Sequence, residues 1–239
     1  MFQPTVSIPH PSATRRPYSS EVVGQANPFP NSRIESTTGV LTGLWRRLRR
    51  ERRRRKVGRA YDMALEVARV IPLHSSVIDV GCGSGFIAHH LSAMLGSNVI
   101  GIDLKEATEA PIDYRQFDGA HFPVGDQSAD AVLLCYVLHH TQDLSVVLSE
   151  LRRVLRDGGL AVVYEDIPEI WWDRFVCWTH NLKWEGRTGR CTFRPESEWR
   201  QFFSSEGFDI VSARRLSRWR NLVHPVSRTF YLLKVEKFD

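Results

Sequence analysis

The chain has 239 residues, of which 42% are hydrophobic and 25% charged, proportions that are ordinary for a soluble globular domain with an extension. Its cysteines form no CxxC pair and no Cys/His set with zinc spacing, so we predict no metal site and a cytoplasmic location. No segment is apolar over the roughly 20 residues that a membrane span needs, and the N-terminus lacks the pattern of a secretory signal.

The net charge of +5 is concentrated in one segment. Ten Arg or Lys residues and a single acid lie between positions 46 and 59, so the remainder of the chain is acidic on balance. Leu44, Trp45 and Leu48 accompany the block Arg46–Lys56, a combination that fits a helix at an anionic membrane surface. The block could also bind RNA, or it could be a solvated basic helix. A peripheral location at the membrane follows from the first interpretation only.

The first 72 residues divide into a tail and a helical region. Residues 1–40 are rich in Pro, Ser, Thr and Asn and are predicted to be disordered. Residues 41–72 are predicted to form a basic helix and then an amphipathic helix, which Pro72 ends. The amphipathic stripe has apolar side chains at three- and four-residue steps: Tyr61, Ala64, Leu65, Ala68 and Ile71.

From residue 73 to 239 the sequence alternates between strand and helix patterns, which indicates one globular domain. Seven runs are typical of strands: 76–80, 99–102, 113–117, 129–134, 160–164, 208–213 and 229–235. Helices are expected at 86–95, 144–155 and 196–206, with a turn at 157–159. This order predicts a Rossmann-like, doubly wound α/β fold with helices on both faces of a mostly parallel seven-stranded sheet. The last strand should be antiparallel, because no helix pattern precedes it, and the crossover between Asp103 and Tyr114 should hold little or no helix.

A glycine-rich turn follows the first predicted strand and precedes a helix. Glycines at 81, 83 and 85 allow the backbone to approach a ligand closely, and Asp103 ends the next strand, where it can accept ribose hydroxyls. The third glycine comes one residue too early for the dinucleotide pattern G-x-G-x-x-G. Asp79 would also repel a pyrophosphate, whereas it suits a cationic ligand such as S-adenosylmethionine (SAM), with its sulfonium and amino group.

Several segments together resemble the class I SAM-dependent methyltransferases, and most closely their type 11 methyltransferase domain. Residues 77–86 resemble the first motif of that family, and 100–104 resemble its ribose-binding strand end. Asp118-Gly119 with Phe122-Pro123 resembles the adenine loop, although Val124 stands where the family has Phe. Residues 128–140 resemble the fourth strand and its exit, and 151–159 resemble the helix and turn before the fifth strand.

The resemblance implies a set of roles around SAM. Asp79 would hold the methionine amino group, and Gly81, Cys82, Gly83 and Gly85 would form the turn beneath the methionine portion. Asp103 would bind the ribose. Leu104, Asp118 and Gly119 would contact the adenine, while Cys135 or Tyr136 would offer backbone groups to the methionine.

The residues on the acceptor side are predicted by position rather than by motif. His139 and His140 follow the fourth strand and are candidate general bases, as are His180, Glu165 and Asp166; the alternative is that the two adjacent histidines cap a helix or satisfy backbone groups. The segment 167–194 is an aromatic-rich insertion that could cover an apolar acceptor, pack on the sheet edge or form an interface. Its candidate acceptor-binding residues are Trp171, Trp172, Phe175 and Trp178.

These observations predict methyl transfer by direct displacement from SAM to oxygen or carbon of a small apolar or aromatic molecule. The Asn- or Asp-Pro-Pro-aromatic motif of base-amine methyltransferases is absent after the fourth strand, where the chain reads Leu134-Cys135-Tyr136-Val137. Two alternatives stay open: an RNA methyltransferase that uses the arginine-rich helix, and a SAM-binding accessory protein without catalysis.

Overall fold

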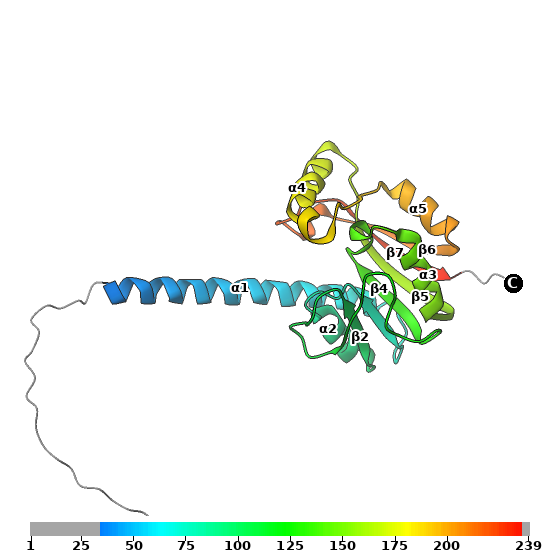
Figure 1. Cartoon of the computed structure of the whole chain (residues 1–239), viewed down its shortest axis with the longest axis horizontal. Helices are drawn as coiled ribbons and strands as arrows, with labels where there is room; N and C mark the ends of the chain where they lie inside the picture. The colour runs from blue at the N-terminus through cyan, green and yellow to red at the C-terminus, as the bar shows by residue number, and fades with distance from the viewer. Residues whose placement is uncertain (1–33, 236–239) are drawn as a thin grey trace, which may run out of the picture. The chain divides into compact units, whose positions relative to one another are not determined.

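The structure is a computed structural model that describes residues 34–235, with only the backbone described for 34–41, 187 and 188 (Figure 1). Helix α1 spans Ile34–Ala68 as one helix, where the sequence predicted two. The predicted tail 1–40 lies largely outside the described residues, and the domain boundaries predicted after 40 and 72 stay predictions. Among residues 34–235, no helix combines the length and apolarity of a membrane span.

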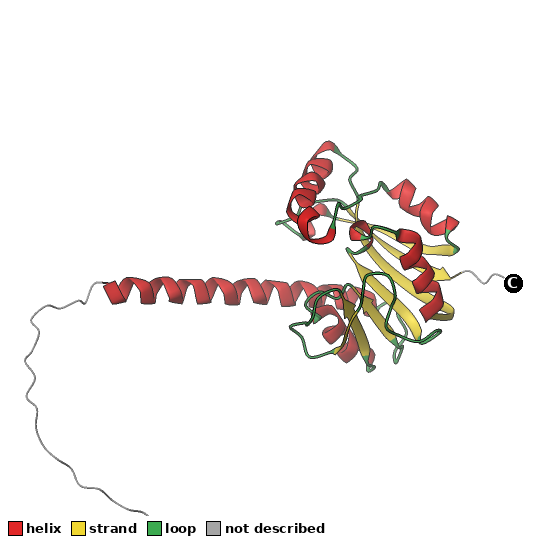
Figure 2. Ribbon diagram, viewed as in Figure 1, coloured by secondary structure: helices red, strands yellow, loops and turns green. Residues whose placement is uncertain are grey.

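Seven strands form one sheet in the order β3-β2-β1-β4-β5-β7-β6 (Figure 2). Strands β1 to β5 are mutually parallel, and β7 is antiparallel to both of its neighbours, which confirms the predicted fold. Only nine residues join β2 to β3, and none of them is helical, as expected from the short crossover. The strands are β1 (Val77–Val80), β2 (Val99–Asp103), β3 (Asp113–Gln116), β4 (Ala129–Cys135), β5 (Leu155–Asp166), β6 (Phe208–Leu216) and β7 (Arg228–Val235).

Helices cover both faces of the sheet because alternate side chains of each strand point to opposite sides. Val132 and Leu134 of β4 face α3 (Leu144–Val154) and α5 (Glu196–Ser205) in one buried cluster. Ala131 and Leu133 of the same strand face α2 (Phe86–Leu95) and the C-terminal part of α1 in the other. Residues 60–71 therefore complete the second layer of the core, since Ala64 and Val67 are fully buried there.

Two regions differ from the sequence-based expectation. Strand β5 begins at Leu155, directly after α3, and pairs with Ala129 before a bulge shifts the register to Leu160 opposite Ala131. The turn predicted at 157–159 is therefore wrong: these residues lie in the bulge, and Gly158 takes the left-handed conformation that the bulge requires. The aromatic insertion contains a helix, α4 (Trp171–Thr188), that was not predicted.

Trp199 anchors the layer formed by α3 and α5. Its side chain is fully buried and stacks on Phe203, with ring centroids 5.6 Å apart. Replacing Trp199 with Ala should therefore lower the free energy of unfolding by about 3–5 kcal/mol, because the neighbouring side chains cannot fill the cavity. Chemical denaturation measures this. Trp219→Ala is the matched control: its side chain is 66% exposed, and it should change stability by less than about 0.5 kcal/mol. An equal loss of stability in Trp199→Ala and Trp219→Ala would contradict the packing described for Trp199.

Candidate functional site

The glycine-rich turn between β1 and α2 has no room for a side chain at Gly81 or Gly85. Gly81, Gly83 and Gly85 all have positive φ values, between 59° and 74°, which disfavour any other residue. A Cβ atom on Gly81 would lie 2.6 Å from Cγ2 of Val137, and one on Gly85 would lie 2.6 Å from Oγ1 of Thr108. The turn thus fits tightly between the residues after β4 and the connection from β2 to β3.

Asp79 is a buried carboxylate with an unmet hydrogen-bonding requirement. Its side chain is 1% exposed, and Oδ2 has no hydrogen-bond partner among residues 34–235. Burial, together with the charge of Asp103, raises the pKa of Asp79 to about 7. A buried carboxylate in this state is stabilised by a cation that docks beside it, so the site favours a positively charged ligand group.

Asp103 connects the end of β2 to the glycine turn. Its Oδ2 accepts a hydrogen bond from Gly83 N at 2.7 Å, and its Oδ1 accepts one from Lys105 N at 3.2 Å. Each carboxylate oxygen has two lone pairs, so both can still accept a hydroxyl of a bound sugar. Asp103 therefore fixes the turn and remains able to bind two adjacent hydroxyls.

Leu104, Asp118 and Gly119 come together beyond the ends of β2 and β3. A Cβ atom on Gly119, whose φ is +92°, would lie 3.2 Å from Cδ2 of Leu104. Leu104 itself is 51% exposed, so an apolar surface is open to a planar ring at this position. Backbone N–H groups of His121 and Ala120 donate to Asp118 and hold its pKa at about 2, which keeps it an anionic acceptor.

The exit of β4 passes over the same turn. Tyr136 has a φ of +60°, an uncommon conformation for a residue with a bulky side chain, and such strain concentrates at functional sites. Its N–H donates to the carbonyl of Tyr164 at 2.9 Å, so the strained geometry is held by β5. Burial raises the pKa of the thiols of Cys82 (to about 12) and Cys135, so both are neutral and neither is a nucleophile.

His139 and His140 lie in the short helix η1 (Leu138–His140), two residues beyond the strained Tyr136. Glu165, at the end of β5, accepts hydrogen bonds from Leu138 N at 2.8 Å and from His139 Nδ1 at 2.7 Å. Burial lowers the pKa of His139, but the Glu165 carboxylate outweighs burial and raises it above the ordinary value. The structure thus brings together His139 and Glu165, which the sequence placed on separate strand ends.

The four aromatic residues predicted to bind the acceptor lie on the exposed side of α4. Trp171, Trp172, Phe175 and Trp178 are 37–75% exposed, and successive rings contact each other with centroids 5.8–6.0 Å apart. The opposite side of α4 carries Asp173, Cys177 and His180 toward the body of the domain. Acceptor binding by the four aromatic residues stays a prediction.

The comparisons with known proteins agree on one family. The family model described as a methyltransferase domain matches residues 78–163. Relatives include a sterol 24-C-methyltransferase of Gibberella zeae, 34% identical over 37% of this chain and 27% of its own length. Another is a ubiquinone biosynthesis O-methyltransferase of Rhizobium rhizogenes, 31% identical over 36% of this chain and 39% of its own length. The chain thus spans well under half of these relatives.

A solved SAM-dependent methyltransferase from Methanosarcina mazei has the same fold, with a TM-score of 0.58, 17% identity, and 72% of this chain and 97% of that chain covered. Residues 78–163 match a methyltransferase domain, which confirms the resemblance found in the sequence over that segment. SAM is the cofactor that this match implies. The residues of this methyltransferase domain fit SAM: the unpartnered Asp79 oxygen suits its amino group, and Asp103 suits its ribose.

Asp79 should make cofactor binding dependent on pH. The product S-adenosylhomocysteine carries a cationic amino group, which requires the ionised carboxylate, whereas the free domain holds Asp79 at a pKa of about 7. Affinity should therefore fall by about tenfold for each pH unit below about pH 7, as Asp79 becomes protonated. Titration calorimetry between about pH 8 and about pH 5 measures this; Asp79→Asn should bind weakly with a flat profile. Wild-type affinity that does not change over this range would contradict the assignment.

Proposed function

We propose that the protein transfers a methyl group from SAM to a small-molecule acceptor, at oxygen or carbon on an apolar or aromatic scaffold. The observation that carries this proposal is the buried Oδ2 of Asp79, which has no partner among residues 34–235, beside a turn with no room for a side chain at Gly81 or Gly85. The turn lies at the carboxyl ends of parallel strands, the edge at which α/β sheets bind ligands. An intact cofactor site of this kind favours catalysis over an accessory role.

The cofactor would lie along the turn, with its parts held by different strand ends. Asp79 would bind the amino group, and the backbone of 81–85 would pass beneath the methionine portion. Asp103 would bind the ribose hydroxyls, with Leu104 and Gly119 against the adenine and Asp118 accepting from its amino group. Backbone groups of Cys135 and Tyr136 would complete the methionine end. The tight packing of Gly81 against Val137 supports this arrangement, because it places the exit of β4 beside the turn.

Methyl transfer would be a direct displacement. A lone pair of an acceptor oxygen, or the π electrons of an acceptor carbon, form a bond to the methyl carbon as the sulfur–carbon bond breaks, and the electron pair of that bond stays on the sulfur of S-adenosylhomocysteine. The acceptor loses a proton to a base or to solvent. Alignment of the acceptor and exclusion of water provide most of the acceleration. His139, oriented by Glu165, is the better placed of the two predicted bases for a hydroxyl acceptor, with His140 beside it (ring centroids 4.3 Å apart).

Two findings support an apolar acceptor. The relatives are named for methylation of a sterol and for ubiquinone biosynthesis, and both names concern apolar molecules. The exposed aromatic residues of α4 provide a surface that could close over such a molecule. We therefore propose a ring-bearing lipid or a related aromatic compound as the substrate class.

The transfer reaction tests this function directly. The full chain is incubated with SAM that carries a labelled methyl group, together with an alkyl hydroquinone, an unsaturated sterol or total RNA. We expect label in either the hydroquinone or the sterol, with one molecule of S-adenosylhomocysteine formed for each methyl group transferred. Trp172→Ala should raise KM for the acceptor without changing cofactor affinity, whereas Trp219→Ala should change neither. Label in RNA alone would favour the RNA alternative, and cofactor binding without transfer would favour the accessory role.

We further propose that the protein is cytoplasmic and that the block Arg46–Lys56 holds it at anionic membrane surfaces. Leu44, Trp45 and Leu48 are 43–65% exposed and lie next to Arg46 and Arg47, so apolar and cationic groups are both available to lipid. Exposed apolar side chains of this size favour a lipid surface over RNA, which requires only the positive charge.

Charge removal in the full chain tests the membrane proposal. Changing Arg46, Arg47, Arg49 and Arg50 to Gln should weaken partition onto phosphatidylserine-containing vesicles by about 100-fold or more, since each basic group near such a surface contributes about 1 kcal/mol. Vesicle co-sedimentation measures the partition of each protein. Phosphatidylcholine vesicles are the control, and neither the wild type nor the variant should bind them strongly. Unchanged partition would contradict the proposal, and loss of RNA binding without loss of vesicle binding would favour the RNA alternative.

A further inference from the structure

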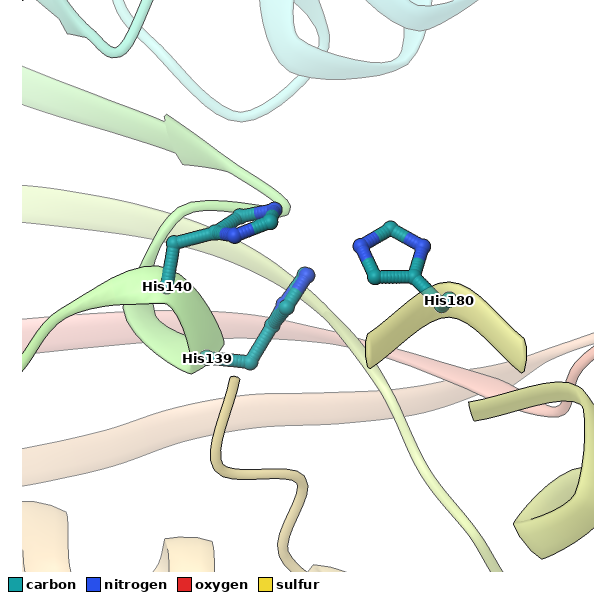
Figure 3. Close-up of side chains that lie close together, drawn as sticks. All are labelled: His139, His140 and His180. Atoms are coloured by element: carbon teal, nitrogen blue, oxygen red, sulfur yellow. The ribbon is translucent and has the colours of Figure 1, made fainter. Parts of the chain in front are cut away.

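Three histidines from two distant parts of the chain converge at the end of the sheet. His139 and His140 come from η1 after β4, and His180 comes from the middle of α4 (Figure 3). One ring nitrogen from each lies within 4.8 Å of those of the other two. Figure 3 shows the three rings close together, and their centroids lie 4.3–5.5 Å apart.

Two of these ring nitrogens are buried without a partner. Glu165 accepts from Nδ1 of His139 at 2.7 Å, so Nδ1 carries a hydrogen and Nε2 is the nitrogen that faces the cluster. His139 is 1% exposed, and neither its Nε2 nor the Nε2 of His180 has a hydrogen-bond partner in the described part of the chain. Buried polar atoms are nearly always paired, so two such nitrogens side by side indicate a missing ligand.

The surrounding structure holds the three side chains in place. Asn181 of α4 binds both backbone groups of Cys191, at 2.7 and 3.1 Å, and Thr192 N donates to the carbonyl of His139 at 2.7 Å. Phe193 stacks on the His139 ring, with centroids 4.6 Å apart. The loop after α4 therefore ties the helix that carries His180 to the segment that carries His139.

Two carboxylates, Glu165 and Asp166, lie buried beside the cluster at the end of β5. Glu165 contacts His139, and Asp166 pairs with His224 at 2.8 Å and with Arg228 at 2.9 Å.

We propose that His139, His140 and His180 bind a divalent transition-metal ion, with Zn²⁺ as the first candidate, and leave its fourth position open. Three imidazoles with one open position are typical of catalytic rather than structural zinc sites. The contact of His139 with Glu165 is the carboxylate–histidine arrangement that orients metal ligands. Around tetrahedral zinc the three nitrogens would lie about 3.4 Å from one another. In the structure they lie within 4.8 Å of one another, so each pair needs to approach by at most about 1.4 Å.

The three imidazole ligands favour a transition-metal ion over hard cations. Mg²⁺ and Ca²⁺ prefer oxygen ligands, whereas imidazole suits Zn²⁺ and the neighbouring first-row ions. Cys191 lies beside this donor set, with its Sγ 3.1 Å from Nδ1 of His140. The sequence showed none of this, because the ligands come from residues 40 positions apart and match no spacing pattern.

The open position gives the site a chemical use. A zinc ion lowers the pKa of a bound hydroxyl or water by several units, so it can supply an ionised oxygen at neutral pH without a separate base. A bound metal would replace His139 as the base, because Nε2 of His139 would then be a ligand. An acceptor hydroxyl on the metal would lose its proton to solvent before it attacks the methyl carbon. This use rests on the proposed methyl transfer, whereas the metal site itself does not.

Metal titration of the tag-free full chain tests the site. Protein stripped with chelator is titrated with Zn²⁺ against a chromophoric competitor, and Co²⁺ is added separately to record the visible absorption of a tetrahedral nitrogen site. We expect one ion per chain. His180→Ala and His140→Ala should each weaken binding by about 100-fold, and Glu165→Gln by about 10- to 100-fold, because Gln cannot accept from Nδ1 of His139.

The controls separate metal binding from folding and from cofactor binding. His89→Ala removes an exposed histidine on α2 and should bind Zn²⁺ like the wild type. S-adenosylhomocysteine affinity, measured without metal, should be equal in wild type and His180→Ala, which shows that the variant is folded. Wild-type protein that binds the cofactor product but no Zn²⁺ would overturn the metal proposal and leave the proposed function standing. Zinc binding that survives both histidine replacements would also overturn it.

Discussion

The buried carboxylate of Asp79 is the constraint on which the cofactor site depends. Asp79 is 1% exposed, and its Oδ2 has no hydrogen-bond partner within the part of the chain that the structure describes. Burying such a carboxylate costs on the order of several kcal/mol unless it is protonated or paired with a cation. The raised pKa of Asp79, about 7, reflects that cost. Such a group persists in a fold when a ligand compensates it, and the amino group of SAM has the required charge and size.

The exit of β4 joins the cofactor site to the histidine cluster. Val137 packs against Gly81 on one side, and His139 follows two residues later and contacts Glu165 on the other. Burial raises the pKa of the Cys135 thiol at the end of β4, and the charges of Asp79 and Glu165 add to this effect. The two sites therefore adjoin the same short segment, in which Tyr136 has the uncommon φ of +60°.

Much of the fold and the cofactor site could be predicted because both are encoded locally. The β-branched run at 77–80 followed by three glycines specifies a strand and a turn within ten residues. A second buried run specifies the next strand, which ends at Asp103. The antiparallel last strand was predictable from the lack of a helix between 214 and 228. Each of these features depends on neighbours in sequence.

The features that could not be predicted depend on contacts between distant residues. Helix α4 is held by Asp173, which is fully buried and accepts from Ser227 N and pairs with Arg218, and no local pattern shows those contacts. The bulge at 156–159 depends on the register between β4 and β5. The histidine cluster requires α4 to lie over the end of β4, so only the tertiary structure reveals it.

Calorimetric titration of the full chain with S-adenosylhomocysteine, beside Asp103→Ala and with NAD as a control ligand, tests the assignment of the cofactor site. We expect one molecule of S-adenosylhomocysteine per chain bound with micromolar affinity, loss of that binding in Asp103→Ala, and no binding of NAD. Binding of NAD instead, or S-adenosylhomocysteine affinity that Asp103→Ala leaves unchanged, would contradict the assignment of this turn as the cofactor site.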